Sequence, residues 1–230
     1  MYKKKNETPE AIYNELKNNN FAYINDIFFK ADVEMSKQKQ FDYNFSGTTC
    51  NIVFQFNKYL VCCSVGDSRG ILIEDRGDSK NLGIVELSHD HKLDLPGEMN
   101  RIVLSGGIVG KITDSFGEKV GPPKIWKAGA NYPGLDMSRS LGDFQAKQCV
   151  VIAIPEIIEY TLTPNSKYLV VCSDGVWKYI KNEQVRDLGN IFYNKNEVGE
   201  FCTDLVKLAV HRWEEFGNFR GDITVLCVYI

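Results

Sequence analysis

Two aspartates stand at the ends of apolar runs in the C-terminal part of the chain. Asp174 follows the apolar run from Tyr168 to Cys172, which is bounded by turn residues and is typical of a strand buried on both faces. Asp222 precedes a second apolar run, from Ile223 to Ile230. If these two strands pair antiparallel, both aspartates lie at the same edge of a sheet. Carboxylates brought together in this way repel each other unless a proton or a cation lies between them.

The residue after Asp174 is compatible with a cation site. Gly175 allows a positive φ or a close backbone approach, and a free carbonyl there would add an oxygen beside the carboxylate, as a hard cation requires. Taken alone, this stretch is better explained as a strand that ends in an Asp-Gly turn. The expected convergence with Asp222 favours the cation site.

Composition limits the function classes. The chain has 230 residues, of which 43% are hydrophobic, so it can form one substantial core. A net charge of −3, with acids and bases interspersed, gives no electrostatic support for nucleic-acid binding. No apolar run approaches the roughly 20 residues of a membrane span, and residues 1–20 are too polar for a signal peptide. We therefore expect a soluble cytoplasmic or nuclear protein without a membrane partner.

The seven cysteines are expected to be reduced core residues. Their number is odd, they form no C-x-x-C pair, and most lie within apolar patterns. His89 and His91 are two residues apart with no third metal-ligand residue type at a metal-site spacing, so they are interpreted as loop residues.

The hydrophobic pattern predicts an α+β protein. Helices are expected from Thr8 to about Asn18, from about Ile24 to about Lys37, and over residues 95–104, 182–190 and 198–213, with Asn182 as an N-cap. Strands are expected over residues 49–56, 59–65, 71–74, 82–87, 108–112, 124–127, 150–154, 157–162, 168–172 and 223–230. The first four strands are interpreted as a meander, and residues 113–135 as an irregular excursion around one short strand. Grouped strands with helices before and after them favour a layered sandwich over βαβ units.

Nine short motifs occur in a fixed order along the chain. They are SGTT at Ser46, VGDSRG at Val65, LSHDHK at Leu87, ExxRIxxxGGxV from Glu98, GPPKIW at Gly121, PGLDMSRSLGDF at Pro133, IPEI at Ile154, SDGVW at Ser173 and GDITV at Gly221. In order and spacing this series resembles the type 2C (PPM-type) metal-dependent protein serine/threonine phosphatases. Each motif is weak alone, and the ordered set carries the resemblance.

The resemblance implies both a fold and a chemistry. It implies a layered α-β-β-α sandwich of two mainly antiparallel sheets flanked by helices, with two Mn²⁺ or Mg²⁺ ions at one edge. A metal-activated water then hydrolyses phosphoserine or phosphothreonine in proteins. By the same resemblance, Asp174 and Asp222 match two ligands of the metal pair, and Asp67 matches an aspartate that helps to hold a weaker third ion.

Some family signatures are missing. An acidic Glu-Asp pair and an Asp-Gly-His-Gly-Gly turn, which in the family lie on the first strands, are not found ahead of the first helix. We therefore expect residues 1–230 to form a single, N-terminally truncated phosphatase-like domain in which the N-terminal strands are missing. Two aspartates offset only part of the charge of two divalent ions. This chain alone is expected to bind the metal pair weakly and to have little or no phosphatase activity.

Two interpretations of function stay open at this point. The chain is most of a metal-dependent phosphatase that acts on a phosphoprotein substrate, or it is an inactive pseudophosphatase that binds a phosphoprotein or a regulatory protein. Lys178, four residues after Asp174, brings a positive charge toward the expected cation site. The sequence gives no physical account of Asp136.

Overall fold

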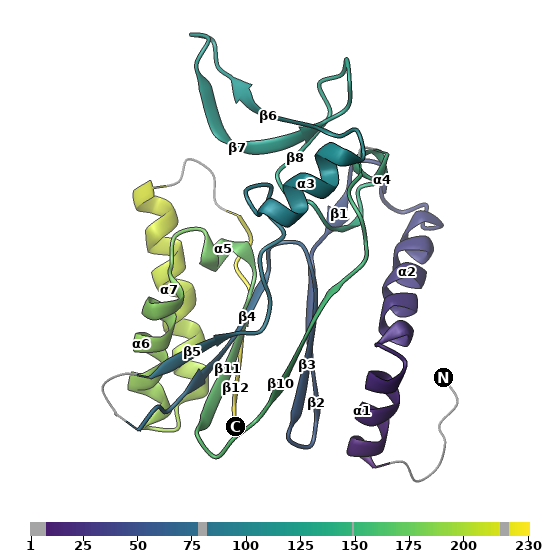
Figure 1. Ribbon diagram of the computed structural model, residues 1–230. Coiled ribbons are helices and arrows are strands. Elements are labelled where there is room, and N and C mark those ends of the chain that lie inside the picture. The colour runs from purple at the N-terminus through teal and green to yellow at the C-terminus, as the bar shows by residue number, and fades with distance from the viewer. Residues whose placement is uncertain (1–7, 78–81, 149, 217–220) are drawn as a thin grey trace.

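Two antiparallel sheets lie face to face between two pairs of helices (Figure 1). The computed structural model describes residues 8–77, 82–148, 150–216 and 221–230. One sheet has the strand order β10-β3-β2, and the other has the order β12-β11-β4-β5. The strands are β2 Cys50–Phe56, β3 Tyr59–Val65, β4 Arg69–Glu74, β5 Gly83–Glu86, β10 Glu156–Thr161, β11 Ser166–Cys172 and β12 Val225–Tyr229. The predicted α-β-β-α sandwich is confirmed.

One pair of helices covers the outer face of each sheet (Figure 1). The helices are α1 Pro9–Asn18 and α2 Ala22–Ser36 on the β10-β3-β2 sheet, and α6 Asn182–Tyr193 and α7 Val198–Phe216 on the other. In α7 the buried residues recur every fourth position, as an amphipathic helix requires: Phe201, Leu205, Ala209 and Trp213. No helix in the described part of the chain is long and apolar enough to cross a membrane.

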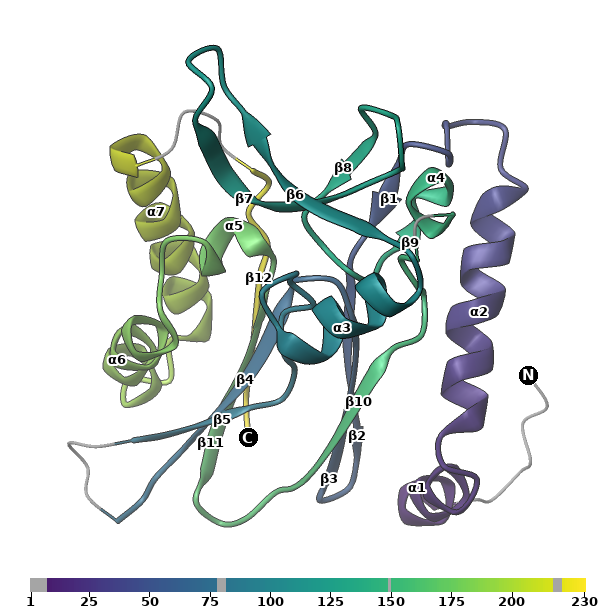
Figure 2. The same ribbon diagram turned by 45° about the horizontal axis from the view of Figure 1, so that its top comes forward.

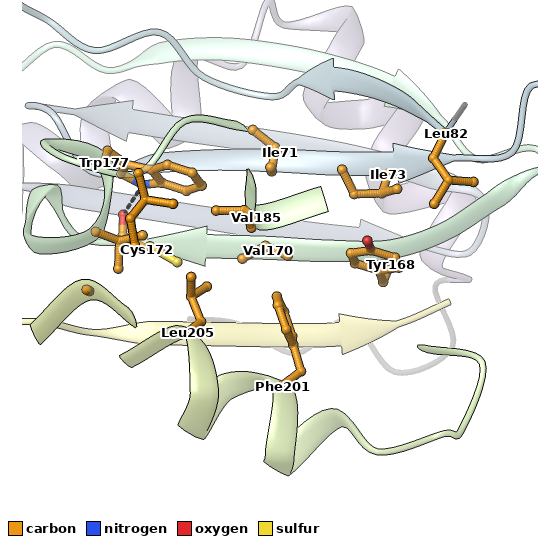
Figure 3. Packing of buried hydrophobic residues seen from close by; sticks show 13 residues of the cluster. Ile71, Ile73, Leu82, Tyr168, Val170, Cys172, Trp177, Val185, Phe201 and Leu205 are labelled. Atoms are coloured by element: carbon orange, nitrogen blue, oxygen red, sulfur yellow. Dashed lines mark hydrogen bonds between the residues drawn. The ribbon is translucent and has the colours of Figure 1, made fainter. Parts of the chain in front are cut away.

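The core under α6 and α7 is the larger of the two outer cores (Figure 3). Tyr168 and Val170 of β11 are fully buried and pack with residues of α7 such as Phe201. The Tyr168 hydroxyl donates to the Arg186 carbonyl at 2.8 Å, so this buried polar atom is satisfied. Burial of each such side chain contributes about 1.5 to 3 kcal/mol. This core holds β11 in a fixed position, and β11 carries Asp174 at its end.

The inner core lies between the two sheets and is built by strand alternation. Leu60 and Cys62 of β3 face Leu72 of β4 and Leu169 of β11, whereas the alternate residues of β3 face α1 and α2. Because β3 is covered on both faces, it shows the continuous apolar run expected of a central strand.

The predicted meander is wrong in one respect. β2 and β3 form the expected hairpin, in which Phe56 pairs with Tyr59 and Asn57 adopts a positive φ of 56°. However, β4 and β5 pair with each other in the opposite sheet. The chain passes from one sheet to the other at Gly66, whose φ is 96°. Periodicity alone could not detect this change, because strands in either sheet have the same alternation.

A third small sheet lies across one end of the sandwich (Figures 1 and 2). It contains β6 Ile108–Thr113, β7 Lys119–Trp126 and β8 Pro133–Leu135, and α3 Pro96–Leu104 lies beside it. The interpretation of residues 113–135 as an irregular excursion around one short strand is therefore wrong. Glycine and proline suggested loops, although here they accommodate register shifts between paired strands.

Two further local predictions are wrong. Residues 150–154 form no strand, and only an isolated bridge joins Arg139 to Ile152. Asn182 is the first residue of α6 and not its cap, which is Lys181.

Cys149 lies outside the described residues, and the other six cysteines are free. The remaining elements are short: β1 Gly47–Thr48, β9 Leu141–Gly142, α4 Phe144–Lys147 and α5 Asp174–Trp177.

A buried carboxylate joins α3 to the segment after β8. Glu98 accepts hydrogen bonds from Arg101 at 2.8 Å and from Arg139 at 2.6 Å, and the Ser138 hydroxyl also donates to it. Burial opposes ionisation of Glu98, but the hydrogen bonds from Arg139, Arg101 and Ser138 outweigh it and lower its pKa to about 2. This network fixes the segment that contains Asp136.

We expect Glu98→Gln to destabilise the fold by about 2 to 3 kcal/mol, less than for a fully buried pair because the arginines are partly exposed. The folded pKa lies below the ordinary value, so this stabilisation is complete above pH ~4.5 and is lost as the pH falls toward ~2. Urea denaturation at several pH values measures it. The exposed Glu34→Gln is the control. Equal destabilisation at every pH in this range would contradict the assignment.

Candidate metal centre

The pairing of β11 with β12 brings Asp174 and Asp222 together. The two strands are antiparallel, and Cys172 at the end of β11 pairs with Val225 at the start of β12. Ser173 extends this contact. Its hydroxyl donates to the Asp222 carbonyl at 3.0 Å and accepts from the Thr224 amide at 2.9 Å. The fold therefore places the Asp222 backbone against the Ser173–Gly175 turn at one sheet edge. Convergence of the two carboxylates on a cation stays a prediction.

Gly175 makes this convergence possible by its lack of a side chain. A Cβ atom at this position would lie 2.3 Å from the Asp222 carbonyl oxygen, closer than any real contact allows. The Gly175 carbonyl accepts a hydrogen bond from the Trp213 indole at 2.7 Å, which ties α5 to α7 and engages one of the two lone pairs of this oxygen. A role of this carbonyl as a cation ligand stays a prediction. Of the two roles expected for Gly175, a positive φ or a close backbone approach, the structure shows the close approach.

Asp67 lies in the turn that leads from β3 to β4. Its neighbour Gly66 has a positive φ, and a Cβ atom there would collide with Thr49. His91 holds the turn in place, because its amide donates to the Gly66 carbonyl at 2.9 Å and its Nδ1 accepts from the Gly66 amide at 3.0 Å. Burial of the imidazole lowers the pKa of His91 to about 4. His91 therefore has a structural role as a neutral acceptor, as expected for a loop histidine.

Lys92 directly follows His91 and contacts two acids. Its ammonium donates to Oδ2 of Asp67, and it lies 4.0 Å from Oδ2 of Asp136. Although burial opposes the charge on Lys92, Asp67 raises the pKa of this lysine, with smaller contributions from Asp136 and Asp174. Sequence reasoning missed Lys92 as part of the site. It had no account of Asp136, which the fold places beside Lys92.

Asp174 lies within electrostatic reach of the same group. Desolvation by the surrounding atoms raises its pKa, although the residue is still exposed at the surface. The carboxylates of Asp67 and Asp136 raise it further, while Lys92 and Lys178 oppose them. The acidic edge therefore comprises Asp67, Asp136 and Asp174, together with Asp222, whose backbone contacts Gly175.

Lys178 is held on an aromatic surface. Its ammonium lies 4.8 Å from the centroid of the Trp213 ring and 5.9 Å from that of the Tyr179 ring. It still lowers the pKa of Asp174. The predicted weakening of a metal site by Lys178 stays a prediction.

Two arginines of the motifs anchor loops. Arg69 makes two hydrogen bonds of 2.8 Å to Asp90 and lies over the Trp177 ring. Arg139 binds Glu98 and the Ile154 carbonyl. Ser138 is fully buried, which excludes it as an accessible nucleophile.

The donor set fits a divalent ion only in part. Carboxylate oxygens are the donors that Mg²⁺ and Mn²⁺ prefer, and Asp174 and Asp222 can supply them at an open edge. Asp67 is engaged by Lys92. Among the described residues, no group of three or more histidine, cysteine, aspartate or glutamate side chains is arranged to hold a metal ion. The role of Asp174, Asp222 and Asp67 as ligands therefore stays a prediction.

The fold and the site together define a class of protein: an α-β-β-α sandwich that carries acidic residues at one sheet edge. The sequence matches the family model for protein phosphatase 2C over residues 3–214. The chain therefore belongs to the protein phosphatase 2C family.

Named relatives agree with this assignment. The chain is 34% identical over 205 residues to "Probable protein phosphatase 2C 12" of Oryza sativa subsp. japonica, covering 88% of this chain and 51% of the relative. It is 32% identical over 196 residues to "Probable protein phosphatase 2C 72" of Arabidopsis thaliana, covering 83% of this chain and 56% of the relative. The chain thus spans about half the length of the curated relatives that it matches.

Solved structures support the fold. A serine-threonine phosphatase 2C from Toxoplasma gondii superposes with a TM-score of 0.79 at 19% identity, covering 98% of this chain and 72% of that chain. The serine/threonine phosphatase Stp1 from Staphylococcus aureus gives a TM-score of 0.56 at 22% identity, covering 99% and 71%. At such identities the similarity establishes the fold and not the activity.

We expect Gly175→Ala to destabilise the fold by about 1 to 3 kcal/mol, because the added methyl group forces α5 away from the Asp222 backbone. Thermal and urea unfolding measure the loss. Gly199→Ala in α7 is the control, since a Cβ atom meets nothing within 4 Å there and alanine favours a helix by up to ~1 kcal/mol. Equal stability of Gly175→Ala and the parent chain would contradict the close approach.

Proposed function

We propose that this chain belongs to a metal-dependent protein phosphatase that hydrolyses phosphoserine and phosphothreonine in a phosphoprotein substrate. The observation that supports the proposal is the backbone contact between the Asp174 turn and Asp222 at one sheet edge in a member of the protein phosphatase 2C family. The proposed cofactor is Mn²⁺ or Mg²⁺. When bound, such an ion activates water and balances charge on phosphoryl oxygens.

The residues at the acidic edge have different roles in the proposed metal site. Asp174 and Asp222 would hold the metal, and Asp67 would join them if it were released from Lys92. Ser173 and Gly175 set the spacing of the two aspartates through contacts with the Asp222 backbone. The ligand set is incomplete, so we propose weak metal binding and low activity for residues 1–230 alone.

The location and the partners are also proposals. Six described cysteines are free thiols, and burial raises the pKa of each. Unreactive thiols of this kind suit a reducing compartment, which supports a cytoplasmic or nuclear location. The proposed partner is a phosphoprotein substrate or a regulatory protein.

Metal binding tests the site directly. In a calorimetric titration with Mn²⁺ we expect weak binding to the parent chain, and a loss of at least about tenfold in affinity for Asp174→Asn and for Asp222→Asn, because each variant removes a charged oxygen ligand. Asp204→Asn is the control, since Asp204 on α7 has a half-exposed side chain and donates no ligand to the acidic edge, pairing instead with Lys207. Two tight sites in the parent chain would refute the predicted incomplete ligand set.

Hydrolysis of p-nitrophenyl phosphate tests the reaction. We expect little activity with Mn²⁺, abolished by a chelator and by Asp174→Asn. A form of the chain extended at its N terminus by a segment with the Asp-Gly-His-Gly-Gly turn should be more active, because that segment supplies further ligands. Absence of activity in both forms would contradict the phosphatase proposal and favour a binding module.

A further inference from the structure

Lys92 places a positive charge of the chain itself inside the acidic edge. Its ammonium donates to Asp67, whose carboxylate is only 6% exposed, and it lies 4.0 Å from the Asp136 carboxylate. Asp174, the first residue of α5, lies within electrostatic reach of Asp67, Lys92 and Asp136. The ammonium therefore stands where a cation would neutralise these acids.

The backbone around Lys92 holds the ammonium at this position. On one side, His91 and Gly66 exchange two hydrogen bonds, which fix the Asp67 turn beside Lys92. On the other side, Lys92 forms a β-bridge with Met137, the residue after Asp136. The Ser138 amide also donates to the His91 carbonyl at 2.8 Å. Asp67 and Asp136 thus reach Lys92 from two different segments that the chain ties to its own backbone.

A divalent ion and the ammonium cannot both occupy this position. A metal ion bound to Asp67 would have to lie about 2.0 to 2.6 Å from a carboxylate oxygen. The hydrogen-bonded ammonium already stands beside Oδ2 of that carboxylate. Two cations so close together in a partly buried setting repel each other strongly. The Lys92 ammonium therefore opposes metal binding at Asp67, and moving it away would remove this repulsion.

We propose that Lys92 is a built-in cation that competes with a divalent metal ion for Asp67 and Asp136. This inference rests on the proposed metal site, and it adds a regulatory residue and an additional acid, Asp136. With Lys92 in place, its charge offsets that of Asp67 and lowers the contribution of Asp67 to metal affinity. With Lys92 displaced, Asp67 and Asp136 become oxygen donors for one divalent ion next to Asp174.

The matched pair Lys92→Met and Lys167→Met tests the competition. Both lysines are ion-paired and partly buried, and Lys167 pairs with Asp75 away from this cluster. In calorimetry with Mn²⁺ alone, we expect Lys92→Met to bind at least about tenfold more tightly than the parent chain, and Lys167→Met to equal it. Adding Asp136→Asn to Lys92→Met should reverse much of the gain. An unchanged or weaker affinity in a folded Lys92→Met variant would overturn the proposal.

A measurement on the unmodified chain does not depend on how the variant folds. Lysine acetylation read by mass spectrometry should show that saturating Mn²⁺ speeds labelling of Lys92 several-fold relative to Lys167, because the displaced ammonium loses its partner. Unchanged labelling of Lys92 while Mn²⁺ is bound would overturn the competition and leave the proposed metal site intact. Absence of Mn²⁺ binding to both the parent chain and Lys92→Met would overturn both proposals.

Discussion

The antiparallel register between β11 and β12 determines the geometry of the acidic edge. These strands pair from Tyr168 with Tyr229 to Cys172 with Val225. Asp174 follows β11 in the sequence, and Asp222 precedes β12. A slip of one residue would turn the partly buried side chains of β12 away from α6 and α7. The hydrophobic core that fixes the register therefore also fixes the spacing of Asp174 and Asp222. Stability and the site depend on the same packing.

Electrostatic repulsion is the cost of gathering carboxylates at one edge. Two unit charges 4 Å apart interact by about 4 kcal/mol at an effective dielectric constant of ~20. The chain offsets part of this with Lys92, whose ammonium pairs with Asp67 and lies 4.0 Å from Asp136. Lys178 adds a second, more distant positive charge, held over Trp213. The acidic edge is thus partly neutralised by residues of the chain itself.

The local pattern of the sequence was sufficient to predict most helices and strands, but it was not sufficient to predict which strands pair in which sheet. The helix from Val198 shows a four-residue apolar repeat, and the hairpin at Asn57 follows from its turn residues. By contrast, β3 and β4 are separated by one short turn and belong to different sheets. The partner of a strand is chosen by packing across the whole core, which no short window of sequence contains. Of the third sheet, the sequence pattern predicted strands only over residues 108–112 and 124–127, because the glycines and prolines of β7 and β8 suggested loops.

The sequence by itself determined which carboxylates are candidates for metal binding, because Asp174 and Asp222 stand at the ends of strongly apolar runs and within ordered motifs. It also determined the layered α+β class and the family resemblance. Only the tertiary structure decided that the carbonyl of Gly175 is occupied by Trp213, and that Lys92 and Asp136 belong to the same group as Asp67. The physical reason is that Asp67, Lys92 and Asp136 come from three separate segments. Their charges interact only after backbone pairing has brought those segments together.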